Sequence, residues 1–189
     1  MGDEKMFTID CGDILLREFQ VEDVDAIYEI TNQPEVYEFL PDWKSTREQR
    51  FNWVTNYEIP SNKSFLEAVP NIEEQRYLRL GIVLKETGEF IGFCTTGIKE
   101  ELPAPNREIA FGISKYHTNK GYTSLAVKGL IQFLFANTNV ECLNAVALER
   151  NVGSNRVIQK NGFEFVGQIE IDKELHNHYV LQKSEWQGR

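Results

Sequence analysis

A glycine-containing turn between a strand-like run and a long helix is the segment of this sequence best suited to bind an anion. Residues 107–114 (REIAFGIS) resemble a strand, and Lys120-Gly121-Tyr122 leads into apolar positions at helical spacing. The first turn of a helix presents unpaired N–H groups and the positive end of the helix dipole, which can hold a phosphate without basic side chains. Most turns of this kind bind nothing, so the turn alone leaves both interpretations open.

A second group of polar residues follows the next buried run. Residues 151–163 read N-x-x-S-x-R-V-x-x-K-x-G-F. Asn151 and Ser154 are placed to begin a short helix, and Gly162 is placed to end it as a glycine C-cap. By itself, this block is explained by a helix cap and a helix-to-strand return.

The elements that must position these motifs form one twisted mixed sheet flanked by helices, an α+β (mixed α/β) fold, in the order β-α-α-β-β-β-α-β-α-β-β. We expect one domain, residues 1–189, in which the strands between 77 and 114 form an antiparallel meander. Residues 60–76 read as a surface excursion, and Ser45 is the expected cap of the second helix. Strands are predicted at 14–19, 77–84, 90–98, 107–114, 143–148, 163–171 and 178–181; helices at 21–31, 46–57, from 121 onward and at 152–160, with a short turn at 36–40.

Composition limits the class of partner. The 20 basic and 29 acidic residues give a net charge of −9, opposite in sign to a basic nucleic-acid-binding module. An acidic surface favours cationic partners such as amines. Three separated cysteines without C-x-x-C spacing indicate reduced, cytoplasmic usage. No stretch approaches the ~18 apolar residues of a membrane span, so we expect neither nucleic acid nor membrane as a partner.

Taken in this order, the motifs resemble the GNAT N-acetyltransferases, and most closely the branch that contains the ribosomal-protein N-terminal acetyltransferases RimJ and RimL. The residues that carry the resemblance are 108–113 (E-I-A-F-G-I), 120–122 (K-G-Y) and the block 151–163. The opening 14–17 and the ending 179–186 also look like this branch, so the likeness covers nearly the whole chain. The resemblance implies the GNAT fold and acetyl transfer from acetyl-CoA, as cosubstrate, to a primary amine.

Three residues depart from the family's pattern. Thr118 stands where the pyrophosphate loop usually has Arg or Gln, Thr123 where it has Gly or Ala, and Leu125 where the branch often has Glu. Because backbone N–H groups hold the pyrophosphate, we expect binding to be retained despite these changes.

The resemblance also implies roles for single residues. Glu108 would be the general base, directly or through a water, and Ser154 would protonate the leaving thiolate. A backbone amide near Ile113 would polarise the thioester carbonyl, and Asn151 would bind the pantetheine arm. The implied cofactor-binding residues are Gly112, Ile113, Ser114, Thr118, Asn119, Lys120, Gly121, Tyr122, Thr123, Ser124, Asn151 and Ser154.

Structural explanations remain open for these residues. Glu108 would equally suit an exposed strand face, paired with Arg107 or a lysine, and Ser154 a helix first turn. His176 and His178 share a strand face if the last strand reaches back that far. Two ligands are too few for zinc, so we expect no metal. The aromatic residues Trp43, Phe51, Trp53 and Tyr57 either shape the acceptor pocket or pack in the core.

Three hypotheses follow. The first is an N-acetyltransferase in which an amine, from a protein N-terminus or a small molecule, attacks the thioester directly. The second is a non-catalytic acyl-CoA-binding or sensor module, suggested by the altered loop. The third is a protein-interaction domain that kept only the fold. The C-terminal strands also offer a surface for a homodimer, although no particular residue argues for one.

Overall fold

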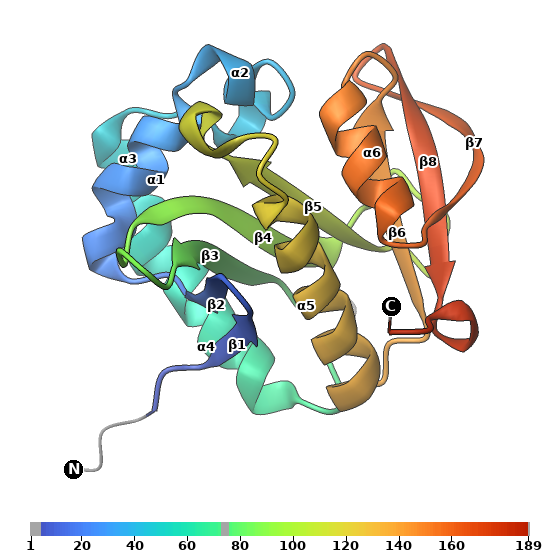
Figure 1. Ribbon diagram of the computed structural model, residues 1–189, viewed down its shortest axis with the longest axis horizontal. Helices are drawn as coiled ribbons and strands as arrows, with labels where there is room; N and C mark the ends of the chain where they lie inside the picture. The colour runs from blue at the N-terminus through green and yellow to red at the C-terminus, as the bar shows by residue number, and fades with distance from the viewer. Residues whose placement is uncertain (1–4, 73–75, 189) are drawn as a thin grey trace.

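The structure is a computed structural model, and it describes residues 5–72 and 76–188. Its centre is one eight-stranded sheet with the strand order β1-β2-β3-β4-β5-β6-β8-β7 (Figure 1). Neighbouring strands are antiparallel except β5 and β6, which are parallel. The strands are β1 (Thr8–Cys11), β2 (Ile14–Glu18), β3 (Leu78–Leu84), β4 (Phe90–Ile98), β5 (Arg107–Ile113), β6 (Cys142–Leu148), β7 (Glu164–Ile171) and β8 (Glu174–Gln182).

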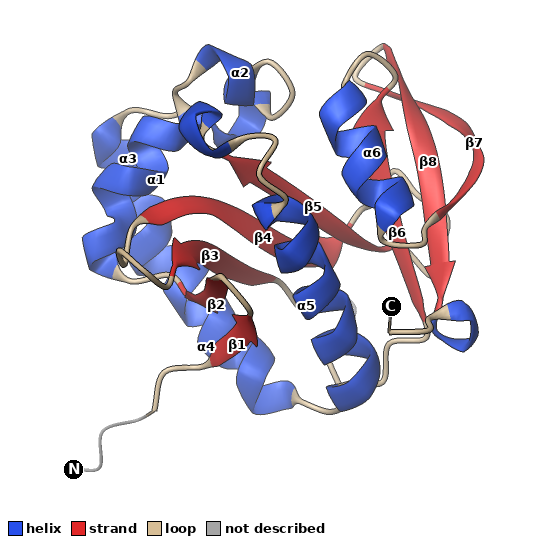
Figure 2. Cartoon of the chain, in the orientation of Figure 1, coloured by secondary structure: helices blue, strands red, loops and turns tan. Residues whose placement is uncertain are grey.

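Helices cover both faces of the sheet (Figure 2). Helix α5 packs on β1, β2, β4 and β5 and contacts α6, whereas α1 and α4 pack on β4 and β3. A larger core forms around the apolar face of α5, and a smaller one joins α1 and α2 to Phe93 of β4. The helices are α1 (Val24–Thr31), α2 (Pro34–Tyr37), α3 (Arg47–Trp53), α4 (Ile59–Ala68), α5 (Tyr122–Asn137) and α6 (Val152–Lys160), with a π-helical segment at Val54–Glu58 between α3 and α4.

The predicted meander and the predicted fold class are confirmed. Strands β3, β4 and β5 pair in sequence order, because tight connections favour antiparallel neighbours. Alternation along these strands sends Leu78, Leu80 and Ile82 into the core beside α5. It sends Arg79, Thr95 and the other alternate residues toward the side that carries α1 and α4.

Two predictions about the helical region are wrong. Residues 60–68 are not part of a surface excursion, because α4 occupies Ile59–Ala68 and buries Phe65; residues 73–75 of the predicted excursion lie outside the described residues. Thr46, and not Ser45, caps α3: its hydroxyl accepts from the Gln49 N–H at 3.1 Å and the Gln49 side chain accepts from the Thr46 N–H at 2.8 Å. This reciprocal capping box satisfies two helix-terminal donors that Ser45 would leave open.

Both ends of the sheet also differ from prediction. An additional strand, β1, forms a hairpin with β2 through Gly12, whose φ is +82°. Strand β8 begins at Glu174, four residues earlier than expected, because Asp172 and Lys173 make a two-residue turn with φ of 52° and 66°. Such primed turns usually contain glycine, so the sequence carries no clear signal for this one.

Candidate active site

Strands β5 and β6 diverge after a short junction (Figure 1). In the described part of the two strands, Glu108 and Asn144 are the one registered pair. The Asn144 amide closes this junction by donating to the carbonyls of Pro105 at 2.9 Å and Arg107 at 3.1 Å. Beyond this pair the strands separate, and backbone groups of β5 are left without strand partners on that side.

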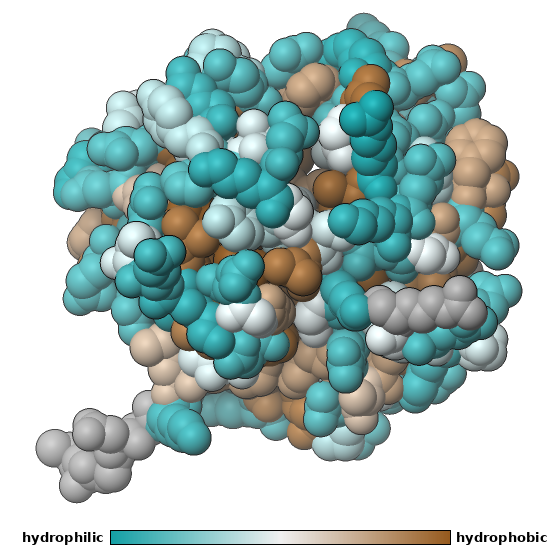
Figure 3. Space-filling view, in the orientation of Figure 1, coloured by the Kyte–Doolittle hydropathy of each residue, from teal (hydrophilic) through white to brown (hydrophobic). Residues whose placement is uncertain are grey.

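A cleft beside this junction contains a cavity of about 420 Å³. Its walls come from β5, β6, the turn before α5, the start of α6 and the α2 region. Hydrophilic side chains cover most of the face that carries α5 and α6 (Figure 3). Eleven of the predicted site residues line the cavity: Glu108, Gly112, Ile113, Thr118, Asn119, Gly121, Tyr122, Thr123, Ser124, Asn151 and Ser154.

Strand β5 turns its free backbone groups toward this cavity. The Ser114 N–H donates to the Ile91 carbonyl of β4 at 2.8 Å. Because backbone groups alternate along an antiparallel pair, the N–H of Ile113 points away from β4, toward the side where β6 has separated. A polar group in the cleft can therefore bind the Ile113 amide without breaking a ladder hydrogen bond.

The turn before α5 presents a second set of donors. Gly121 is the N-cap in the left-handed region, with φ of 81°, and no side chain caps it. Asn119 is also left-handed, with φ of 59°. The first intrahelical bond recorded at this end runs from the Leu125 N–H to the Gly121 carbonyl. The N–H groups of Tyr122, Thr123 and Ser124 thus have no helical acceptor, and the helix dipole makes this end electropositive.

Two predicted ligands do not line the cavity. Ser114 is buried, and its hydroxyl accepts from Gln33 Nε2 at 3.2 Å, which ties β5 to the residue before α2. Lys120 is exposed on the outer side of the turn. The sequence placed both correctly in the turn, but the direction of a side chain in an irregular turn depends on its tertiary contacts.

Glu108 lies at the closed end of the cleft. Desolvation raises the pKa of its carboxyl group to about 7, the nearby Lys99 ammonium opposes the rise, and the Glu101 carboxylate adds to it. No described residue donates a hydrogen bond to this carboxyl group. Arg107 points to the other face of β5 and donates to the Arg76 carbonyl at 3.0 Å. The geometry therefore favours a free, desolvated carboxyl group over a paired surface one.

Asn151 and Ser154 begin α6 beside this carboxyl-containing cleft. The Asn151 side chain is the N-cap and accepts from the Ser154 N–H at 3.2 Å. The Ser154 hydroxyl makes no hydrogen bond with the described residues and lines the cavity. Capping by Asn151 thus leaves the serine hydroxyl available to a ligand.

Sequence reasoning missed one wall of the cavity. Val36, Phe39 and Leu40, from α2 and the residues after it, line it together with Lys99 and His176. No spacing rule links these segments to β5, because the sheet topology alone brings them together. The predicted aromatic residues are absent from the lining: Trp43 instead stacks on Phe93, with ring centroids 4.0 Å apart.

The histidines of β8 lie on one strand face, as predicted. His178 Nε2 is 2.9 Å from Asn144 Oδ1, and burial lowers the pKa of its imidazole. His176 lines the cavity. Within residues 5–72 and 76–188, no three His, Cys, Asp or Glu side chains gather as a metal-binding group. In the same residues, no helix has the length and apolar composition needed to cross a bilayer.

The sheet therefore splits beside a helix N-terminus without a side-chain cap, and the Glu108 carboxyl group lies at the junction. A family model described as "Acetyltransferase (GNAT) domain" matches residues 13–164. The chain belongs to the GNAT acetyltransferase family and is by that membership an acyltransferase.

Relatives and solved structures agree with this family. The chain is 23% identical over 157 residues to the uncharacterized N-acetyltransferase p20 of Bacillus licheniformis, and the matched residues make up 82% of each protein. It is 23% identical over 179 residues to the uncharacterized N-acetyltransferase YnaD of Bacillus subtilis (strain 168), covering 92% of this chain and 95% of that protein.

The fold is similar to that of solved GNAT structures. A GNAT-family acetyltransferase from Bacillus anthracis has a TM-score of 0.75 at 20% identity, over 95% of this chain and 100% of that one. Mycobacterium smegmatis RimJ in complex with CoA-disulfide has a TM-score of 0.74 at 18% identity, over 96% of this chain and 88% of that one. AAC(6')-Ib in complex with paromomycin and acetyl-CoA has a TM-score of 0.71 at 17% identity, over 92% of this chain and 96% of that one.

Proposed function

We propose that this chain, as one catalytic domain, transfers the acetyl group of acetyl-CoA to a primary amine by direct attack of the amine on the thioester. The observation that carries the proposal is Glu108. A carboxyl group whose pKa is raised to about 7, without a hydrogen-bond partner among the described residues, lines the cleft. A general base is most effective when its pKa lies near the working pH.

The residues of the cleft fit the cosubstrate. The uncapped N–H groups of Tyr122, Thr123 and Ser124 suit a pyrophosphate, as helix N-termini do. The free edge of β5 at Ile113 suits an extended amide-containing arm, which can add to a strand edge. A Cβ at Gly121 would meet nothing within 4 Å, so the space above this turn is open. Acetyl-CoA supplies an activated acetyl thioester at this place.

The residues of this chain then have distinct tasks. Glu108 accepts the proton that an ammonium group must lose before it becomes a nucleophile. The Ile113 N–H donates to a carbonyl oxygen that gains negative charge. The Ser154 hydroxyl donates a proton to a departing thiolate. Asn151 holds the start of α6, and with it Ser154, in place.

We place the chain in the RimJ/RimL-like branch because residues 108–113 and 151–163 follow that branch's motifs. The acceptor is a protein N-terminus or a small amine. Solved structures that share the fold include both kinds of protein: RimL, a ribosomal L7/L12 alpha-N-protein acetyltransferase, and the aminoglycoside acetyltransferase AAC(6')-Ib. An acidic chain with a free carboxyl group in its cleft suits either cationic acceptor.

The alternative is a non-catalytic acyl-CoA-binding or sensor module. The observation that favours it is the loop itself: Thr118 and Thr123 both line the cavity, where the family has other residues. In this alternative the cleft binds acetyl-CoA and no amine is acetylated.

We also propose a cytoplasmic location and a homodimer. All three cysteines are free thiols, which suits a reducing compartment. Strand β7 is the outer strand of the sheet and exposes Phe165 and Val166, so a second copy has an edge to pair with. Sedimentation of the purified protein tests the dimer, and a monomer at all concentrations would contradict it.

Calorimetric titration with acetyl-CoA, CoA and ADP tests the cofactor site without an acceptor. We expect a micromolar dissociation constant for acetyl-CoA, about −8 kcal/mol. Release of CoA thiol in the presence of an amine panel then separates the enzyme from the binding module. Binding without turnover of any amine would establish the module, and absence of binding would refute both.

A further inference from the structure

The acceptor side of the cleft is the side formed by β5, α2 and the residues next to them, and its lining charges are already paired except for one carboxyl group. Glu35 Oε1 lies 3.7 Å from Lys115 Nζ, and Glu101 Oε1 lies 3.4 Å from Lys99 Nζ. Glu108 has no such partner among the described residues. Each buried or half-buried cation needs an anion close by, so this side of the cleft neutralises one additional positive charge and not several.

We propose that the acceptor is a small monoamine with an apolar body, held between Glu108 and α2. This inference rests on the proposed function and selects one class from the acceptors that it leaves open. The amine would lie at Glu108, and the body would pack on the apolar wall. That wall consists of Val36, Phe39 and Leu40 on one side and of Val146 and Leu148, from β6, on the other.

Helix α2 lines the cleft, and the residues at both of its ends contact other parts of the site. At its start, Gln33 bonds to the residues that end β5: Gln33 Nε2 donates to Ser114 Oγ at 3.2 Å, and the Lys115 N–H donates to Gln33 Oε1 at 2.8 Å. At its end, Glu38 lies 3.6 Å from Arg150, which follows β6. The helix thus connects the two strands whose separation makes the cleft.

Arg150 also links this end of α2 to the hairpin of β7 and β8. Its guanidinium donates to Glu174 at 2.7 Å and stands 5.7 Å from the centre of the Phe39 ring. The side chains of Arg150, Glu38 and Glu174 are each about half exposed, at 50%, 53% and 50%. Because exposed ion pairs are weak and break readily, these contacts hold α2 beside the C-terminal hairpin only loosely.

Size points to the same class of acceptor. The cavity of about 420 Å³ must hold both the reacting end of the cosubstrate and the acceptor. Ligand pockets commonly span ~300–1,000 Å³, so this one is near the small end before it is shared. A polycation of several rings, or an extended polypeptide that has to pass α2, fits this space poorly.

The test compares acceptors of each class on the full chain. The probes are phenethylamine, spermidine, kanamycin and a hexapeptide with a free N-terminus, with CoA release measured for each. We expect kcat/KM for phenethylamine to exceed the other three at least about tenfold, the size of discrimination that a hydrophobic pocket can give. Calorimetry of the same probes against the protein with CoA gives a readout independent of turnover, and phenethylamine should bind most tightly there too.

Two variants test the apolar wall and the contacts that Arg150 makes at the end of α2. Phe39→Ser should lower kcat/KM for phenethylamine about tenfold without changing the affinity for acetyl-CoA. Its control is Phe51→Ser, since Phe51 is 46% exposed and does not line the cavity. Arg150→Ala should raise the turnover of the hexapeptide relative to phenethylamine. Lys85→Ala, which removes another exposed ion pair, should not.

Preference for spermidine, kanamycin or the hexapeptide would overturn this inference and leave the acetyltransferase in place. Equal effects of Phe39→Ser and Phe51→Ser would also overturn it. If acetyl-CoA binds and none of the amines is acetylated or bound, the proposed function falls together with the inference.

Discussion

Glu108 of β5 lies opposite Asn144 of β6 at the point where the two strands stop pairing. The Asn144 side-chain amide donates to the carbonyls of Pro105, before β5, and of Arg107, in β5, and its oxygen contacts His178 Nε2. It therefore offers no hydrogen bond to the carboxyl group beside it. The result is a carboxyl group at the closed end of a cleft, desolvated and unpaired with described residues. This relationship is the basis of the role that we propose for Glu108.

Replacing Glu108 with Gln should lower kcat/KM by roughly 10²–10⁴-fold, the usual contribution of a positioned base. In the unchanged protein, activity should rise with pH through about 7, because the carboxyl group must be deprotonated to accept a proton. The rate–pH profile of the two proteins measures this. Glu101→Gln is the matched control: removing this like charge should move the acidic limb to lower pH and retain activity. A Glu108→Gln enzyme with unchanged turnover would remove the residue from its role.

The same carboxyl group should cost stability at neutral pH. Its pKa is raised from 4.5 to about 7 in the folded chain, so the folded state binds the proton more tightly than the unfolded state. The contribution of this group to stability is therefore largest below pH 4.5 and is lost as pH rises from 4.5 to 7. Glu108→Gln should be more stable than the unchanged protein by on the order of 3 kcal/mol at pH 8, at about 1.4 kcal/mol per pKa unit, and equal to it at pH 4. Urea denaturation at both pH values measures the difference, and a constant difference would contradict this account.

Gly121 and Gly153 should respond in opposite directions to alanine. A Cβ meets nothing within 4 Å at either site, but Gly121 has φ of +81° and Gly153 lies in α6. An L-residue in the left-handed region costs roughly 1–2 kcal/mol, so Gly121→Ala should destabilise the protein by about that amount. Gly153→Ala should stabilise it by ~0.5–1 kcal/mol through helix propensity. The free energies of unfolding in urea decide this, and a similar sign for both variants would contradict the role assigned to the turn.

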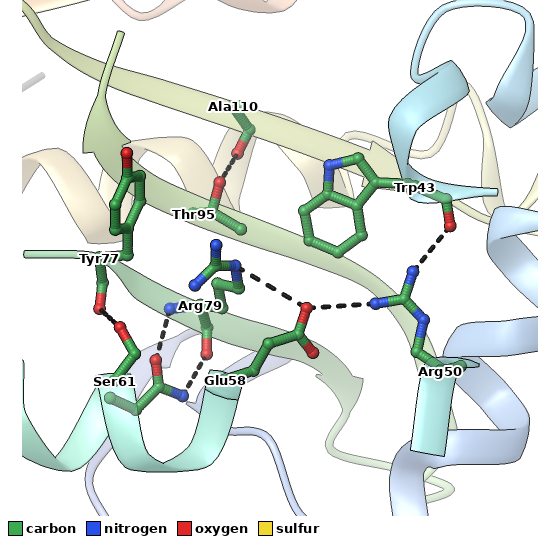
Figure 4. A network of polar contacts seen from close by, with 9 residues as sticks. Trp43, Arg50, Glu58, Ser61, Tyr77, Arg79, Thr95 and Ala110 are labelled. Atoms are coloured by element: carbon green, nitrogen blue, oxygen red, sulfur yellow. Dashed lines mark hydrogen bonds and ion pairs between the residues drawn. The ribbon is translucent and has the colours of Figure 1, made fainter. Parts of the chain in front are cut away.

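Glu58 contacts two arginines, Arg50 of α3 and Arg79 of β3, where the helices pack on the sheet (Figure 4). Glu58 Oε1 lies 3.2 Å from Arg50 and 3.9 Å from Arg79, and Arg50 is almost fully buried. Desolvation raises the pKa of Glu58 and lowers that of Arg50, while their mutual attraction opposes both changes. Glu58→Gln should cost on the order of 3 kcal/mol, because it leaves a buried cation uncompensated.

The control for Glu58 is an exposed pair. Asp25 and Arg47 form an ion pair whose side chains are each 62% exposed. Asp25→Asn should cost less than ~1 kcal/mol, since water already solvates both groups. Equal losses in the two variants, measured by denaturation at low salt, would mean that the buried cluster contributes no more than a surface contact.

The local parts of the site could be predicted from the sequence. The Gly121 turn, the Asn151 cap and the strand that carries Glu108 depend on contacts between near neighbours. Such contacts are encoded by residue type and spacing: a positive φ favours glycine, a side-chain oxygen caps a helix, and alternation marks a strand. The order of the motifs along the chain was sufficient to indicate the family.

Tertiary structure decided what the sequence left open. The separation of β5 from β6 depends on strand pairing across distant segments, and the same pairing determines whether Glu108 is paired or free. Helix α4 and strand β1 form because the sheet gives them apolar surface and hydrogen-bond partners that residues 60–76 and 8–11 do not provide locally. The wall formed by Val36, Phe39 and Leu40 lines the cleft because tertiary contacts hold α2 there. Gln33, before α2, donates to Ser114, and Glu38, after it, pairs with Arg150. Interactions between residues far apart in the chain have no period in the sequence, so the fold alone brings these groups together.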